Sequence, residues 1–296
     1  MHVDLPSGIR IEYESFGNDD APLILLVMGL GAHMQRWNIE ICEGLVARGY
    51  RVVRFDNRDA GLSSKADGAP IPSLADVAAA VSEGRPTQVP YTLDDMAADS
   101  IALLDALSVD AANVVGISMG GAIAQIMAAR YPARVRSLAC LMTSSGNPAL
   151  PWPTPEAAAA LFAPLPRDRS REAIVADGIR RYRAVASPAY PMPEQRLQAM
   201  FGLEYERCFH PQGVARQLAA IVASGDRREL LASIRVPTLV LHGADDPLIR
   251  PACGEDVARH IPGACWQCID GMGHDLPLAL TDRLVGAIAD NAARAS

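Results

Sequence analysis

Short runs of apolar residues alternate along the chain with longer segments in which apolar side chains recur every three or four positions. Continuous short runs are typical of strands buried on both faces of a sheet, and the segments between them are typical of amphipathic helices. The expected strands lie at residues 23–27, 50–55, 113–117, 135–142, 238–242 and 265–269. Strands that alternate with helices form a mostly parallel sheet with helices on both faces, so the pattern predicts an α/β fold.

The clearest helical period runs from Thr92 to Leu107, where the apolar side chains share one face and the aspartates fall elsewhere. Thr92 and Asp95 have the spacing of a capping box, with Asp in place of the usual Glu. The preceding residues, 65–90, are rich in Ala, Pro and Gly. We therefore expect an irregular excursion there, followed by a well-capped helix.

Residues 146–229 break the alternation, because they contain no convincing strand. A proline-rich stretch, 147–155, is followed by helical periodicity at 157–162, 171–186 and 194–203. Long excursions from a compact sheet usually carry function. We expect a helical cap at 146–229 on a core of residues 1–145 and 230–296. The alternative is a set of packing helices that touch no ligand.

Composition narrows the function. Half of the 296 residues are hydrophobic, and the net charge of -7 argues against a nucleic-acid partner. The N-terminus has neither the basic nor the apolar region of a secretory signal, and no apolar run approaches the roughly 20 residues that span a bilayer. A cytoplasmic enzyme without membrane insertion is expected, and assembly into a homo-oligomer is left open.

Six cysteines are scattered along the chain, which is typical of reduced, buried thiols. Cys265 and Cys268 have the spacing of a redox or zinc motif. They lie in a run, 264–269, that we expect to be a buried strand, on which such a pair points to opposite faces. No second pair has the spacing of a zinc ribbon, so no metal is expected.

The sequence Gly116-Ile117-Ser118-Met119-Gly120 contains the GxSxG pattern. An apolar strand precedes it and a helical run follows, which is the setting of a nucleophile elbow. There, small residues permit a tight turn that exposes the serine oxygen. The amide of Met119, at the start of the helix, would donate to a developing oxyanion.

Serine needs an adjacent base, and His274 is the best placed of six histidines. It lies in a glycine loop after the last expected strand, at the same sheet edge as Ser118. Asp245 and Asp246 follow the preceding strand, and either could orient the imidazole. The resulting order, Ser, Asp, His, is that of the α/β-hydrolase fold.

With these motifs the chain resembles the α/β-hydrolase superfamily over nearly its whole length, and specifically its aclacinomycin methylesterase-like branch. The segments that carry the resemblance are 27–31 leading to Trp37, 54–63, 90–93, 116–120, 243–247 and 273–274. The resemblance implies that Asp246, three residues past a strand-ending glycine, is the triad acid. It also implies that the amide of Leu30 completes the oxyanion hole, although Met28 replaces the common histidine before Gly29.

By the same resemblance, Asp56, Arg58 and Asp59 form a scaffold that braces the loop beside the oxyanion hole. The predicted enzyme is a carboxylesterase that needs no cofactor and acts on medium-sized hydrophobic esters. Its expected apolar wall lies between the elbow and the cap. That wall comprises Leu30, Met119, Met142, Trp152 and Leu248.

Other functions share this machinery. A carbon–carbon bond hydrolase of ring-cleavage products keeps the same triad, and an acyltransferase or perhydrolase differs in what intercepts the acyl-enzyme. A dehalogenase would need a carboxylate in place of Ser118. A receptor that uses the fold without catalysis is disfavoured by the intact triad and oxyanion loop.

Overall fold

All six expected strands are present in the computed structural model, which describes residues 1–295. They belong to one eight-stranded sheet with the order β1-β2-β4-β3-β5-β6-β7-β8. The strands are β1 His2–Asp4, β2 Arg10–Phe16, β3 Leu23–Val27, β4 Arg51–Phe55, β5 Ala112–Ile117, β6 Val135–Leu141, β7 Thr238–Gly243 and β8 Cys265–Ile269. From β4 to β8 every neighbouring pair is parallel, so the predicted α/β sheet is confirmed.

The sequence interpretation missed β1 and β2, which pair antiparallel with each other and with β4. In β2, Ile11 is fully buried, whereas Arg10 is exposed and the later residues are half-buried. A strand with one solvated face shows alternation and not a continuous apolar run. Polar and apolar side chains alternate over residues 10–14, and this period-two pattern was the signal to follow.

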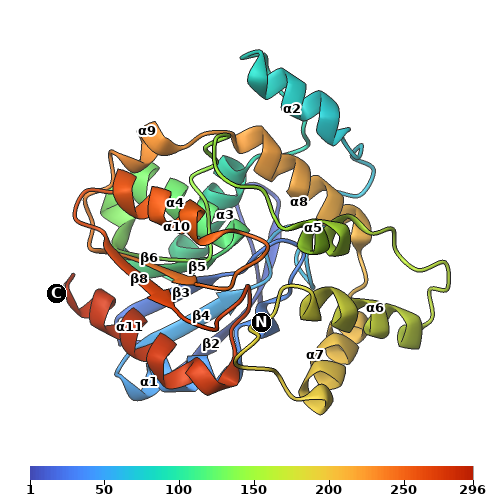
Figure 1. The fold of residues 1–296 in the computed structure, drawn as a ribbon. Coiled ribbons are helices and arrows are strands. Elements are labelled where there is room, and N and C mark those ends of the chain that lie inside the picture. Colours follow the sequence, from blue (N-terminus) through green and yellow to red (C-terminus); the bar gives the residue numbers. More distant parts are fainter. Residues whose placement is uncertain (296) are drawn as a thin grey trace.

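Helices cover both faces of the sheet (Figure 1). On one face lie α1 Ile39–Ala47 and α11 Thr281–Ala293, and on the other lie α3 Leu93–Ala106, α4 Met119–Arg130 and α10 Pro251–His260. The expected capping box holds, because the Thr92 hydroxyl accepts from the Asp95 amide and the Asp95 carboxylate accepts from the Thr92 amide. Short 3₁₀ turns occur at Met34–Arg36, Pro132–Arg134 and Leu278–Leu280.

Residues 65–90 are not wholly irregular, since they contain α2 Leu74–Ser82, which projects from the body of the protein and contacts α8. Between β6 and β7 the chain forms only helices. They are α5 Pro155–Phe162, α6 Arg171–Arg183, α7 Glu194–Arg207, α8 Pro211–Ser224 and the short α9 Arg228–Leu231. The sequence periodicity had indicated the first three of these but not α8.

Hydrogen bonds attach this helical segment to the loops that follow the carboxyl ends of β3, β7 and β8. The Gly31 amide donates to Gln217 of α8, and the Thr154 amide donates to the Pro247 carbonyl. The His274 amide donates to the Val185 carbonyl at 2.7 Å. Residues 146–229 therefore lie at the edge of the sheet where parallel strands end.

One expectation about β8 is wrong. It is the edge strand of the sheet, and its cysteines, Cys265 and Cys268, are exposed. An edge strand is covered on fewer sides than a central one, so apolar content alone did not report burial. Cys42, Cys140 and Cys253 are buried as expected. Within residues 1–295, no helix has the length and apolar content needed to cross a membrane.

Candidate active site

Ser118 lies at the turn between β5 and α4. Its backbone has φ 56° and ψ −121°, a conformation that L-residues rarely adopt and that persists only where the surroundings enforce it. A methyl group on Gly116 would lie 2.1 Å from the Gly120 carbonyl oxygen, and one on Gly120 would lie 2.1 Å from that of Val27. Both glycines are therefore required for the turn, as the predicted elbow demands.

The amides of Leu30 and Met119 are both free near this serine. Neither donates a hydrogen bond to any group within residues 1–295. The loop that carries Leu30 lies against the elbow, because a methyl group on Gly29 would be 3.2 Å from the Ser118 Cβ. Unpaired backbone donors beside a nucleophile are the structural requirement of an oxyanion hole.

A hydrogen-bond network fixes the loop of Leu30. The Asn57 side chain donates to the carbonyl of Met28, two residues before Leu30, at 2.9 Å. Directly after Leu30, the Gly31 amide donates to the Gln217 side chain at 2.7 Å. Gln217 in turn donates to the Arg58 carbonyl at 2.7 Å. Gln217 is completely buried, and sequence reasoning had no signal for it because α8 was not predicted.

The charged residues after β4 take part in the same scaffold. Asp56 accepts from the Met34 and Leu62 amides and pairs with Arg207 of α7 at 2.9 Å. Asp59 accepts two hydrogen bonds from Arg216 of α8. These contacts are internal to the protein, which agrees with the bracing role that the resemblance implied.

His274 and Asp246 are in direct contact, with 2.7 Å between Nδ1 and Oδ2. Asp246 is fully buried, and its other oxygen accepts from the Leu248 and Ile249 amides at 2.9 Å each. Asp245 is exposed and accepts from the Gly271 amide instead. Of the two aspartates left open by the sequence pattern, the structure pairs Asp246 with the histidine.

The two partners shift each other's pKa. Burial alone would raise the pKa of Asp246, but the charge of His274 and hydrogen bonds from His242 and His274 lower it to about 2. Burial would lower the pKa of His274, but the charge and hydrogen bond of Asp246 outweigh it and raise the pKa above 6.5. The carboxylate thus stays ionised, and the imidazole gains affinity for a proton.

His242 is a further neighbour of Asp246 that the sequence placed only as a packing residue. Its Nε2 lies 2.8 Å from the Ile249 carbonyl and 3.4 Å from the Asp246 carboxylate. The side chain is completely buried. His242 therefore belongs to the surroundings of the candidate triad acid, and its position directly before Gly243 offered no signal for this.

The five residues of the expected apolar wall differ in burial. Met142 is fully buried and packs with the core around α1 and α11, and the Met119 side chain packs in the opposite core. Trp152 is 81% exposed, so its indole lies in solvent. Leu30 and Leu248 are half-buried and remain suitable lining residues.

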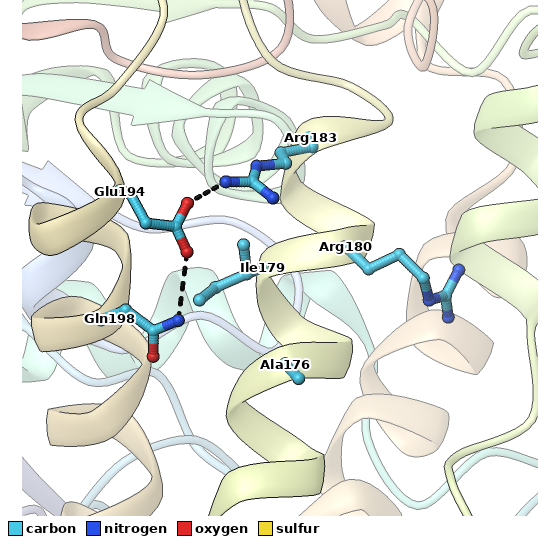
Figure 2. Close-up of a pocket in the computed structure, with 6 residues that line it drawn as sticks. All are labelled: Ala176, Ile179, Arg180, Arg183, Glu194 and Gln198. Atoms are coloured by element: carbon cyan, nitrogen blue, oxygen red, sulfur yellow. Dashed lines mark hydrogen bonds and ion pairs between the residues drawn. The ribbon is translucent and has the colours of Figure 1, made fainter.

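A cavity of about 180 Å³ lies between the loop that carries Leu30 and Gly31, the loop after β4 and the helices α6 to α8. Its walls include Gly31, His33, Ile174, Phe201, Tyr205 and Val214. Ser118 is not among its lining residues. A second hollow, between α6 and α7, is polar at its rim, where Glu194 contacts Arg183 and Gln198 (Figure 2). It lies within the helical segment and not at the elbow.

Within the described part of the chain, no group of three or more His, Cys, Asp or Glu side chains is arranged to hold a metal ion. The carboxyl edge of the sheet carries a serine on a strained turn, free amides beside it and a histidine–carboxylate pair. These groups suit nucleophilic acyl transfer.

The chain is similar to known hydrolases. A family model described as alpha/beta hydrolase fold matches residues 22–278. The chain is 29% identical to a rhodomycin D methylesterase of Streptomyces peucetius, over 91% of this chain and 90% of that protein. It is 27% identical to a 3-oxoadipate enol-lactonase of Acinetobacter baylyi, over 86% and 82% of the two chains.

A solved structure, the enol-lactonase from Burkholderia xenovorans LB400, matches with a TM-score of 0.73 and 26% identity, covering 98% of this chain and 99% of that one. These relatives are hydrolases, and the resemblance to the methylesterase branch is confirmed at the level of relatedness. The family model covers most of the chain, and the order of the strands in the sheet agrees with it. The chain therefore belongs to the alpha/beta hydrolase fold family.

Proposed function

We propose that the protein hydrolyses carboxylic esters, with Ser118 as nucleophile, His274 as general base and Asp246 as the acid that orients the histidine. The observation that carries the proposal is the buried 2.7 Å contact of Asp246 with His274, at the same sheet edge as the strained Ser118. A structural histidine would need no buried ionised partner at this edge. A base that must hold a proton transiently does need one.

The groups then act in sequence. Ser118 Oγ attacks the ester carbonyl while His274 takes its proton through Nε2, since Nδ1 faces Asp246. The amides of Leu30 and Met119 bind the oxyanion of the tetrahedral intermediate. His274 returns the proton to the departing alcohol, and water hydrolyses the acyl-enzyme by the same steps.

Residues 146–229 act in this proposal as a cap that shapes the substrate site. Their contacts with the loops of Gly31, Pro247 and His274 support that role. The wall of the cavity beside the oxyanion loop combines apolar and aromatic side chains with four charged residues, Asp59, Asp177, Arg181 and Glu204. In this proposal the apolar side chains contact the apolar part of a medium-sized ester. The relatives are named for a methyl ester and an enol-lactone, and both compounds contain an acyl–oxygen bond of this type.

Covalent labelling tests the nucleophile. An organophosphonate ester should add once to the protein, on Ser118, because the elbow alone combines an activated hydroxyl with oxyanion donors. Ser118→Ala should not label and should lose on the order of 10⁴-fold in kcat. The melting temperature should stay near that of the wild type, since the half-buried hydroxyl contributes little packing. Labelling of another serine would contradict the assignment.

A substrate panel tests the reaction class. We expect turnover of p-nitrophenyl esters, methyl esters of aromatic polyketides, or lactones, each by cleavage of an acyl–oxygen bond. Ring-fission dienoates test the alternative of carbon–carbon bond hydrolysis with the same triad. Turnover of dienoates without turnover of any ester would replace the ester hydrolase with that alternative.

A further inference from the structure

The loop that carries His274 is joined to the turn after α6 by a dense set of hydrogen bonds. The His274 amide donates to the Val185 carbonyl at 2.7 Å, and the Gly273 amide donates to the Ser187 hydroxyl at 2.9 Å. The backbones meet without room for a side chain, because a methyl group on Gly273 would lie 2.6 Å from the Val185 carbonyl oxygen. The two segments thus interlock at the residue that precedes the histidine.

On the other side of the histidine, Asp275 turns its carboxylate into the same turn. One oxygen accepts from the Ser187 amide at 2.9 Å and from the Ser187 hydroxyl. The other oxygen accepts from the Tyr182 hydroxyl at 2.6 Å. All three side chains are at most 9% exposed. The Ser187 hydroxyl therefore accepts from one neighbour of His274 and donates to the other.

Within residues 1–295, Asp275 has no Lys or Arg ion-pair partner. Burial raises the pKa of its carboxyl, and the hydrogen bonds from Ser187 and Tyr182 only partly offset this. The charged groups that face the cluster are His274 on the core side and Arg36, which acts on Tyr182. A buried carboxylate that depends on three neutral donors is costly to keep unless its geometry matters.

We propose that Tyr182, Ser187 and Asp275 form a positioning cluster, which holds the imidazole of His274 against Asp246 by fixing the backbone on both sides of the histidine to the helical segment. This inference rests on the proposed function, in which His274 is the base. The cluster touches no reacting atom, so its residues are positioning residues. It makes the geometry of the base depend on how residues 182–189 dock.

The cluster can affect the chemistry because it anchors the backbone on both sides of His274. From the core side, the loop is tied by the Asp245 amide, which donates to the Met272 carbonyl, and by the imidazole contact itself. The Gly271 amide also donates to Asp245, and the Asn38 side chain donates to the Leu276 carbonyl. Within the described residues, the amides of Gly273 and His274 and the carboxylate of Asp275 bond only to Tyr182, Val185 and Ser187. A shift of about 1 Å at a catalytic group can cost on the order of 100-fold in rate, so loosening this attachment should reach the chemistry.

Two variants test the cluster. Ser187→Ala removes the bridge between Gly273 and Asp275, and Tyr182→Phe removes one donor to Asp275 with little change of shape. For each we expect kcat on a short-acyl ester to fall on the order of 10-fold to 100-fold, with a smaller change in KM. Organophosphonate titration of active sites corrects kcat for any unfolded fraction.

A matched control is Ser137→Ala. Ser137 is also buried, and its hydroxyl donates to Asn113 at 2.8 Å where β5 and β6 begin, away from the elbow. This variant loses a comparable buried hydrogen bond and should keep kcat per titrated site. Equal losses of kcat per site in Ser187→Ala and Ser137→Ala would overturn the proposal, because they would reflect general destabilisation.

A second measurement does not depend on activity. In a Ser118→Ala background, the imidazole pKa of His274 is measured by NMR titration, with His274→Gln used to assign its signals. Adding Ser187→Ala should lower that pKa toward the ordinary value, since the Asp246 contact loosens. An unchanged pKa would overturn the positioning role even if esters are hydrolysed. Failure of the proposed function would appear separately, as a wild type that neither turns over esters nor labels.

Discussion

The loops after β5, β7 and β8 and the helices of residues 146–229 meet at one edge of the sheet, but their shapes are specified in different ways. The Ser118 turn is dictated locally, by a strand, two glycines and a helix within a few residues. The helical segment is placed by side chains that pair across the sequence, such as Gln217 with Gly31 and Arg207 with Asp56. Local backbone demands can be read from short motifs, whereas pairings over more than 100 positions cannot.

The loops and the helical segment also differ in how far their side chains are buried. Asp246 is completely buried and bonded on every side, so its role is narrowly defined by its surroundings. On the helical segment, Trp152 and Phe162 are exposed. We therefore expect substitutions in the loops to change the chemistry, those at the junction to change it moderately, and those on the exposed surface to change it least.

Asp246→Asn should show the largest effect and tests the loop side of this comparison. An asparagine at this position cannot stabilise the imidazolium and favours the wrong tautomer of His274, so kcat should fall on the order of 10⁴-fold. Asp245→Asn is the matched control, because that residue is exposed and bonds only the Gly271 amide. Its kcat/KM should stay near the wild-type value. A reversed order would move the triad acid to Asp245.

The pH dependence of kcat/KM should be the next largest effect. His274 must start neutral, and its pKa lies above the ordinary 6.5 because the charge of Asp246 outweighs the effect of burial. Activity should therefore fall as pH drops through a value above 6.5. At pH 5 it should be reduced about 30-fold or more, since the neutral fraction falls tenfold per pH unit. A profile that stays flat down to pH 5 would exclude a histidine base.

Much of the fold and of the candidate site could be predicted from the sequence. Six strands, the elbow and the histidine loop followed from continuous apolar runs and glycine spacing. The choice of Asp246 over Asp245 came from the family resemblance, and the structure pairs Asp246 with His274. Each of these features depends on residues that lie close together in the chain.

The remainder depended on tertiary contacts. Strand β2 was missed because it is not a continuous apolar run, and α8 was missed although it supplies Arg216 and Gln217. Met142 was expected in the substrate wall, but it directs its side chain into the core beneath the sheet edge. Which side of an irregular segment faces a pocket is decided by packing, and composition carries no record of it.

Gln217→Ala tests the junction between the two regions. The substitution leaves the Gly31 amide and the Arg58 carbonyl without their partner in a buried site, which should cost about 1–3 kcal/mol of unfolding free energy per unsatisfied group. Because Gly31 follows Leu30, the oxyanion donor should also lose alignment. We expect kcat to fall on the order of 10-fold, well below the loss of a whole oxyanion donor.

The control for Gln217→Ala is the same substitution at another glutamine of residues 146–229, one that does not contact the Leu30 loop. Gln198→Ala on α7 removes an exposed side chain that bonds only Glu194. It should leave kcat unchanged, as measured with a p-nitrophenyl ester. If both variants lose activity to the same degree, the Gln217 bridge has no particular role in aligning the Leu30 loop.

Trp152→Ala should show the smallest effect and tests the exposed side of the comparison. The indole is 81% exposed, so its removal forfeits little buried area, and surface substitutions of this kind usually change stability by less than about 0.5 kcal/mol. The ratio of kcat/KM between long-acyl and short-acyl esters should therefore change by less than about threefold, which corresponds to about 0.6 kcal/mol. Phe201→Ala, which removes a largely buried ring from the cavity wall, is the informative partner and should change that ratio more. A large change with Trp152→Ala would mean that the indole folds over the ester once substrate is bound, and the boundary between the two regions would have to include it.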